Sequence, residues 1–261
     1  DIWQRDYLGS LKPCTVRTYK TAISNHILPA MGAVKLADLH PHMVQSFING
    51  LKLAPSSARL VYQVLHRALE KAVDLDCIPR NPSDRCELPR MEREEIHPLD
   101  DQQVAALLEA AKGTSLEYVV TVALFTGMRQ SELLGLTWDA VDLTTGAISV
   151  SKQLSRLEHR DGGLFVSPKS GKGRTITAAP VVLRALQAQK RRQAEMQLKA
   201  GPIWDNPHGL VFTNEAGAPL EQRAVDYQFK RIVAAAGLEG VRFHDTRHTY
   251  AVNAIRAGDD I

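Results

Sequence analysis

Apolar residues recur at three- and four-residue spacing along the N-terminal part of the chain, which is the pattern of amphipathic helices. Thr15 is expected to cap a first helix, which Pro29 and Gly32 are expected to end. Pro41 is expected to open a second helix at its first turn, and Ser56 or Ser57 a third. These segments predict a small helical bundle.

The pattern changes after residue 90. Residues 91–98 are charged, flanked by prolines and without periodicity, which predicts an interdomain linker. Asp100 is expected to cap a new helix, and an apolar helix over 116–126 is expected to end near Gly127. Further helices are predicted at 181–199, 220–236 and 244–257, with Gly237 and Gly258 at the C-terminal ends of two of them.

Three short β-prone segments, at 141–153, 163–167 and 174–178, are separated by glycine-containing turns. They predict a three-stranded antiparallel sheet. The expected fold class is therefore mainly α with a small antiparallel β-sheet (α+β). Two domains are expected, a helical one over 1–90 and a second one over 99–261.

Composition is that of an ordinary soluble globular protein, with 44% hydrophobic and 23% charged residues in 261. No apolar run approaches a membrane span, and no signal peptide opens the chain. The three cysteines match no metal-ligand spacing and favour free thiols in a reducing cytoplasm. We therefore expect a cytoplasmic protein without a membrane partner.

Basic charge is concentrated in two places, although the formal net charge is only +3. Residues 1–90 hold 12 Lys and Arg against 8 Asp and Glu, and residues 152–174 hold six basic against two acidic residues. This distribution favours local contacts with phosphate groups. The alternative is a solvated hairpin tip that binds no ligand.

The segment TGMRQSELLGL, at 126–136, places Arg129 at a helix start beside a glycine turn. A guanidinium group is a permanently charged planar fork that suits two phosphate oxygens. Glu132 lies three residues on, on the same helix face, and is expected to hold Arg129 in place. A surface Arg–Glu pair without a ligand is the alternative.

The segment HDTRHTY, at 244–250, places His244 and Arg247 on one side of a helix. His244 and His248 are also four residues apart, as in zinc-protease helices. However, such helices carry Glu after the first His, where this chain has Asp245, and no third ligand follows. We therefore expect no metal site.

Lys169 lies in the basic hairpin between these two segments. A lysine there can reach the leaving oxygen of a phosphodiester and donate a proton to it. Lys172 and Arg174 are rival candidates for this role.

Together the three elements resemble the catalytic residues of tyrosine recombinases, the phage integrase family, and most resemble the integrases of conjugative transposons. The resemblance implies a two-domain, C-shaped clamp on double-stranded DNA. It implies that Arg129 and Arg247 bind the scissile phosphate, that His244 assists proton transfer, and that Lys169, rather than its rivals, protonates the leaving group. It also implies strand exchange through a 3′-phosphotyrosyl intermediate without a cofactor or a metal. Arg17, Lys20, Arg59, Lys172 and Arg174 are expected to contact DNA.

The family carries its tyrosine nucleophile further from the His-x-x-Arg motif than residue 261. Tyr250 is three residues past Arg247 and therefore too close. The chain is expected to be a fragment without its nucleophile and without an N-terminal arm-binding domain, which binds DNA but does not cleave it. We expect the fragment to be a monomer in solution, and the full-length protein to be a homo-oligomer on DNA.

Two other functions are compatible with these residues. A type IB topoisomerase shares similar catalytic chemistry, although a compact helical domain before the catalytic residues favours site-specific binding. A regulator that binds DNA without cleaving it is the other alternative.

Overall fold

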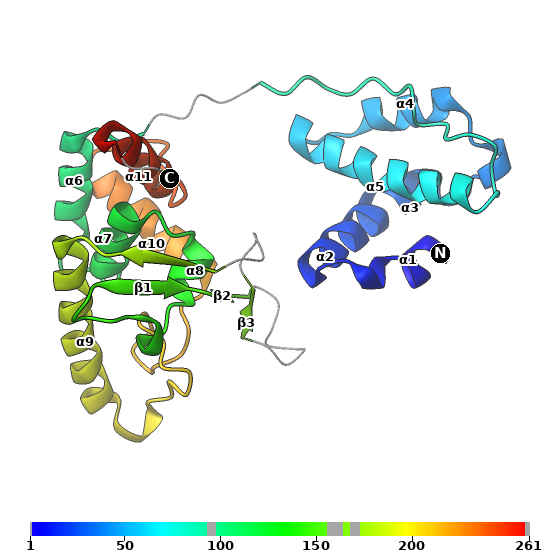
Figure 1. The fold of residues 1–261 in the computed structure, drawn as a ribbon. Coiled ribbons are helices and arrows are strands. Elements are labelled where there is room, and N and C mark those ends of the chain that lie inside the picture. The colour runs from blue at the N-terminus through cyan, green and yellow to red at the C-terminus, as the bar shows by residue number, and fades with distance from the viewer. Residues whose placement is uncertain (1, 93–97, 156–163, 168–172, 259–261) are drawn as a thin grey trace. The chain divides into compact units, whose positions relative to one another are not determined.

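The computed structural model describes residues 2–92, 98–155, 164–167 and 173–258. The chain divides into two compact units, Asp1–Glu94 and Glu95–Ile261, each with its own hydrophobic core (Figure 1). Within the described residues, no helix has both the length and the apolar surface that a membrane span needs.

The described part of the N-terminal unit is helical. Its elements are α1 (Ile2–Asp6), η1 (Leu8–Ser10), α2 (Pro13–Ala22), η2 (Ile23–Ile27), α3 (Leu28–Met31), η3 (Leu36–Asp38), α4 (Pro41–Gly50) and α5 (Pro55–Asp74). Its core consists of two adjoining clusters of buried side chains, which α2, α4 and α5 supply for the most part.

Prolines open the three main helices of this unit. Pro13, Pro41 and Pro55 each occupy the first helical position, where a missing N–H costs nothing and the backbone angle is already helical. The predicted start at Pro41 is confirmed. The predicted cap at Thr15 and the predicted start at Ser56 or Ser57 are wrong, because these residues lie inside the first turns of α2 and α5.

Of the two residues predicted to end the first helix, Pro29 does not end it, whereas Gly32 does and occupies the C-cap position of α3. The chain continues from α2 through the π-helical turn η2 into α3, and the N–H of Leu28 donates to the carbonyl of Ile23, five residues back. A wider turn of this kind loosens the helix next to a residue that lacks an N–H. The helix therefore runs on to Met31.

The segment after α5 is tied to that helix by polar side chains. Arg59 donates from Nε to the carbonyl of Pro89 at 2.9 Å, and Asn81 donates from Nδ2 to Oε2 of Glu70 at 2.9 Å. Arg59, expected as a DNA contact, therefore has a partner within the fold.

The C-terminal unit combines helices with short strands. Its elements are α6 (Asp101–Ala111), α7 (Glu117–Thr126), α8 (Gln130–Leu134), η4 (Trp138–Ala140), β1 (Ala147–Val150), β2 (Gln153–Leu154), β3 (Phe165–Val166), β4 (Arg174–Thr177), α9 (Pro180–Ala200), η5 (Gly201–Ile203), α10 (Gln222–Ala235) and α11 (Asp245–Ala257). The expected class, mainly α with small antiparallel β-structure, is confirmed.

Local signals at the helix ends are confirmed in this unit. Asp100 caps α6, and its carboxylate and the side chain of Gln103 exchange hydrogen bonds with each other's backbone N–H groups. Gly127, Gly237 and Gly258 follow α7, α10 and α11 with positive φ angles.

The predicted three-stranded sheet is wrong for the described residues, which form two separate antiparallel pairs, β1 with β4 and β2 with β3. The first ladder stops at the pair Val150–Arg174. The chain then turns to pack β2 against α8, where Gly135 permits close approach: a Cβ atom there would lie 2.5 Å from the backbone nitrogen of Leu154.

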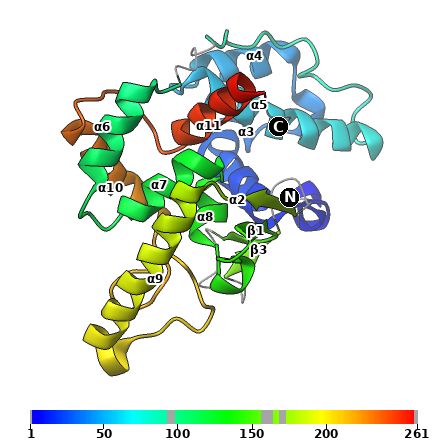
Figure 2. The ribbon, with the colours of Figure 1, turned by 60° about the vertical axis from the view of Figure 1, so that its left-hand side comes forward.

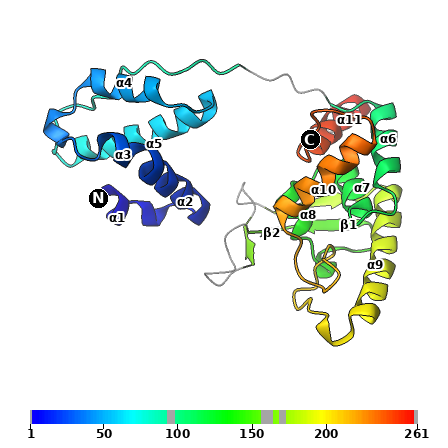
Figure 3. The ribbon, with the colours of Figure 1, turned by 180° about the vertical axis from the view of Figure 1, so that it is seen from behind.

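Helix α7 is the centre of this unit, because most of its side chains are buried. It contacts α6, α9 and α11 (Figure 2), while α9 also lies beside one end of the β1–β4 ladder (Figures 1 and 3). The C-terminal end of α7 thereby brings α8, which follows it, close to α11.

Candidate active site

A glycine turn joins α7 to α8 and positions Arg129. Gly127 has φ +59° and ψ 19°, a left-handed conformation that ends α7. Arg129 then occupies the N-cap position of α8. A Cβ atom on Gly127 would lie 2.3 Å from the ring of Tyr250 in α11, so the turn depends on glycine for space as well as for backbone angle.

Glu132 holds Arg129 from within α8. Its side chain is fully buried, with 0% of its surface exposed. Oε1 accepts from Nη1 of Arg129 at 2.8 Å, and Oε2 accepts from the backbone N–H of the same residue at 3.0 Å. The expected support of Arg129 by Glu132 is thus present in the geometry.

A second arginine reaches the same carboxylate from the sheet. Arg174, the first residue of β4, donates from Nη1 to Oε1 of Glu132 at 3.1 Å and from Nη2 to Oε2 at 2.7 Å. Burial alone raises the pKa of Glu132, but the hydrogen bonds from Arg174 and Arg129 outweigh it and hold the pKa at about 2. The carboxylate is therefore ionised at neutral pH.

Arg247 supplies a third guanidinium group from α11. Its Nη1 donates to the carbonyl oxygen of Gly127. Burial, together with the positive charges of Arg129 and Arg174, lowers the pKa of Arg247, and Glu132 opposes this shift. Three guanidinium groups therefore surround a single carboxylate, which leaves a surplus of two positive charges.

His244 stands at the N-cap of α11, one turn before Arg247. Desolvation lowers the pKa of His244, and the neighbouring His248 and Arg247 lower it further. The rings of His244 and His248 pack edge to face, with their centroids 4.9 Å apart. At neutral pH, His244 is therefore a neutral imidazole that can accept a proton.

The structure thus brings together Arg129, Glu132, Arg174, His244 and Arg247 around the ends of α7 and α11. Lys169 and Lys172 lie outside the described residues. Sequence spacing did not identify Arg174 as a partner of Glu132, because the two residues are 42 apart in the sequence. Their contact depends on how β4 aligns with β1, which is visible only in the strand ladder.

In the described part of the chain, one group of His, Asp and Glu side chains has the spacing of metal ligands, and it does not include His244 or His248. It consists of His66, Glu70 and Asp84 in the N-terminal unit. His66 and Asp84 form an ion pair at 3.2 Å. These side chains hold the segment after α5 against that helix.

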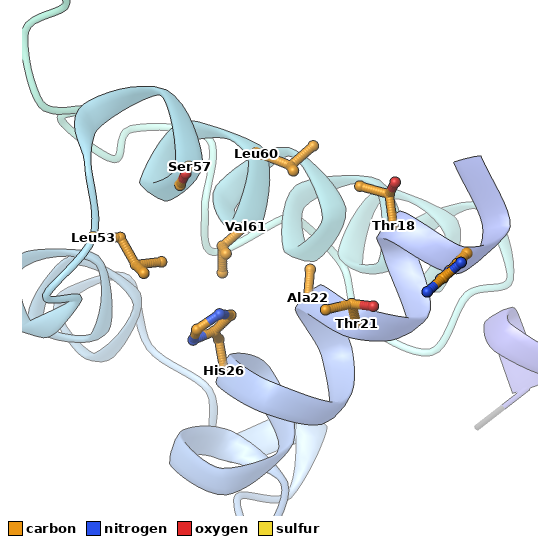
Figure 4. Close-up of a pocket in the computed structure, with 9 residues that line it drawn as sticks. Thr18, Thr21, Ala22, His26, Leu53, Ser57, Leu60 and Val61 are labelled. Carbon is orange, nitrogen blue, oxygen red and sulfur yellow. The ribbon is translucent and has the colours of Figure 1, made fainter. Parts of the chain in front are cut away.

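The N-terminal unit has a hollow of about 330 Å³ between α2 and α5 (Figure 4). Apolar and polar side chains from both helices line it. Arg17 is one of them, and Lys20 is exposed on the same helix. The lining residues are Arg17, Thr18, Thr21, Ala22, His26, Leu53, Ser57, Leu60 and Val61.

Replacement of Gly127 by alanine is expected to lower the free energy of unfolding by about 2–4 kcal/mol, because the methyl group meets Tyr250 in a left-handed backbone. Gly113 is the matched control: it has φ +69°, but a Cβ atom there would meet nothing within 4 Å. Gly113→Ala is expected to cost only about 1 kcal/mol. Urea denaturation measures both, and equal losses would contradict the packing argument.

Glu132→Gln is expected to destabilise the protein in a pH-dependent way. The folded pKa of Glu132 is about 2 against an ordinary value of 4.5, so its contribution is present above pH 4.5 and is lost as pH falls towards 2. This shift corresponds to about 3 kcal/mol at neutral pH. Thermal unfolding of both proteins between pH 7 and pH 3 measures the difference, which should narrow below pH 4.5.

Glu109→Gln is the control for this experiment, because Glu109 pairs with Lys112 on the surface with 70% of its side chain exposed. It is expected to show little change at any pH. A destabilisation by Glu132→Gln that stayed constant from pH 7 to pH 3 would contradict the assigned ionisation.

Comparison with known proteins identifies relatives of both units. Residues 97–261 match the phage integrase family, and residues 1–52 match the phage integrase N-terminal SAM-like domain. An integrase of Saccharopolyspora erythraea is 27% identical over 315 residues, which cover 95% of this chain and 71% of the relative. A XerC-like tyrosine recombinase of Caldanaerobacter subterraneus is 28% identical over 269 residues, which cover 95% of this chain and 69% of the relative.

Two solved structures share the fold. The integrase of the transposon Tn1549, in complex with transposon right end DNA, superposes with a TM-score of 0.84 at 21% identity, over 99% of this chain and 87% of the other. A lambda integrase dimer bound to a core site superposes with a TM-score of 0.75 at 18% identity, over 99% of this chain and 90% of the other. The chain belongs to the phage integrase family, the tyrosine-type site-specific DNA recombinases.

Proposed function

We propose that Arg129 and Arg247 together bind the scissile phosphate of duplex DNA during site-specific recombination. The surplus of two positive charges around the buried Glu132 carries this proposal. A phosphodiester has one negative charge, and its two non-bridging oxygens fit the donors of guanidinium groups. As negative charge grows on those oxygens in the transition state, fixed cations stabilise it without reorganisation.

In this proposal, His244 and Lys169 carry out the proton transfers. A tyrosine hydroxyl oxygen attacks phosphorus, the bond from phosphorus to the 5′ oxygen breaks, and a 3′-phosphotyrosyl bond forms. His244 is suited to assist removal of the tyrosine proton because its lowered pKa keeps it neutral. Lys169 donates a proton to the leaving 5′ oxygen, a role that rests on its position in the sequence.

The six tyrosines of residues 1–261 do not act as the nucleophile in this proposal. Tyr250 packs against the Gly127 turn, Tyr19 is buried, and Tyr62 donates its hydroxyl to the carbonyl of Ser83. Tyr227 is exposed on α10. A covalent DNA adduct that mapped to Tyr227 or Tyr250 would refute this part.

The N-terminal unit is proposed to contact the duplex through α2 and α5. Arg17 and Lys20 are exposed on α2, and Arg17 is one of the residues that line the hollow between α2 and α5. Each phosphate contact changes the slope of log affinity against log salt by about 0.9. The salt dependence measured for Arg17→Ala and Lys20→Ala tests this assignment, and slopes equal to that of the unsubstituted protein would refute it.

The setting proposed for the reaction is the cytoplasm, with the full-length protein assembled as a homo-oligomer on DNA. The lambda integrase structures, a dimer bound to a core site and a tetramer bound to a Holliday junction, support assembly. Sedimentation with and without DNA measures it, and a full-length protein that stayed monomeric on its recombination site would refute it. Covalent adducts formed by the full-length protein separate an enzyme from a regulator, and strand exchange between two sites separates a recombinase from a topoisomerase.

In the full-length protein, Arg129→Ala and Arg247→Ala are each expected to slow covalent cleavage of a suicide substrate by on the order of 10²–10³. DNA affinity should change little, because one phosphate contact is lost among many. Arg191→Ala is the control, since Arg191 is exposed on α9. If both variants cleaved at the control rate, these arginines would have no place at the scissile phosphate.

Lys169→Ala is expected to slow cleavage by on the order of 10²–10⁴, the usual contribution of a general acid. A substrate with a 5′-bridging sulfur atom should restore the rate, because a thiolate leaves without a proton. Lys172→Ala is the control and should show neither the loss nor the rescue. Loss and rescue in Lys172→Ala alone would move the role to that residue.

A further inference from the structure

Among the arginines of this cluster, Arg174 has no role in the chemistry proposed above. It begins β4 opposite Val150 of β1, so the strand ladder fixes its backbone. About a third of its side chain is exposed, and both of its Nη atoms are directed to Glu132. A two-point contact between a guanidinium fork and a carboxylate keeps the two groups in one plane.

The hydrogen bonds on Glu132 alternate between the two arginines. Oε1 accepts from Arg129 Nη1 at 2.8 Å and from Arg174 Nη1 at 3.1 Å. Oε2 accepts from the Arg129 backbone at 3.0 Å and from Arg174 Nη2 at 2.7 Å. Because Arg174 holds both oxygens, it determines the plane of the carboxylate, and that plane determines where Oε1 holds the Arg129 guanidinium.

The sharing also affects charge. If Glu132 paired with Arg129 alone, the two opposite charges would largely cancel. A carboxylate shared by two guanidinium groups does not neutralise either of them. Arg129 therefore keeps positive charge for a ligand while it remains anchored. In the described part of the chain, Arg174 and Arg129 are linked by their shared partner Glu132, so the influence of Arg174 passes through this carboxylate.

We propose that Arg174 is a positioning residue for strand cleavage: through Glu132, it orients the guanidinium of Arg129 towards the scissile phosphate. This inference rests on the proposed function of Arg129. It predicts that the geometry of the fork matters, and that positive charge at position 174 is not enough.

The test uses the full-length protein and a suicide substrate, with single-turnover cleavage measured at saturating protein and duplex affinity measured separately. Arg174→Ala and Arg174→Lys are both expected to slow cleavage by roughly 10- to 100-fold, by analogy with residues that orient metal ligands. The Kd for DNA should stay within about threefold, since a phosphate contact is not lost. Lysine does not rescue because a point charge cannot bridge both carboxylate oxygens.

A double-mutant cycle with Glu132→Gln separates positioning from direct contact. If Arg174 acts through Glu132, adding Arg174→Ala to Glu132→Gln should slow cleavage by less than about threefold more. If Arg174 touches the phosphate, its full effect should persist in the Glu132→Gln background, and the proposal would be wrong. Recovery of the cleavage rate by Arg174→Lys would overturn it as well.

Arg191→Ala serves again as the control, and thermal unfolding checks each variant. If the unsubstituted protein formed no covalent adduct, the proposed function would fail. If it did form one and both Arg174 variants cleaved at the rate of Arg191→Ala, only this inference would fail. Loss of folding in both Arg174 variants would assign Arg174 a role in stability and overturn the proposal.

Discussion

The burial of one carboxylate constrains the whole cluster of charged side chains. An ionised glutamate without solvent costs several kcal/mol unless donors satisfy both oxygens. Glu132 meets this requirement with four hydrogen bonds from Arg129 and Arg174. The requirement fixes α8 relative to β4, and it creates a concentration of positive charge that the fold alone would not maintain.

The second constraint is space at the Gly127 turn. Tyr250 packs against this glycine where a Cβ atom would not fit, and Arg247 donates to its carbonyl from the same helix. α11 can therefore approach the end of α7 closely, which brings Arg247 within electrostatic reach of Arg129. The glycine before one arginine, Gly127, and the tyrosine after the other, Tyr250, are thus parts of one contact.

Sequence reasoning predicted what depends on neighbouring residues and failed where distant segments decide. The cap at Asp100 and the glycines after α7 and α10 follow from local backbone preferences, and the support of Arg129 by Glu132 follows from helical spacing. The separate strand pairs depend instead on the packing of β2 against α8. The Arg174–Glu132 contact joins residues 42 apart in the sequence and depends on the register of β4 against β1, which periodicity does not predict.

We propose that two arginines of this cluster, Arg129 and Arg247, neutralise the scissile phosphate. The most direct test replaces that phosphate with a methylphosphonate, which has the same shape but no negative charge. On this substrate the need for a cation disappears, so Arg247→Ala in the full-length protein should cleave far faster than it does on the ordinary phosphate. If Arg247→Ala were equally slow on both substrates, the account of the charge cluster would be contradicted.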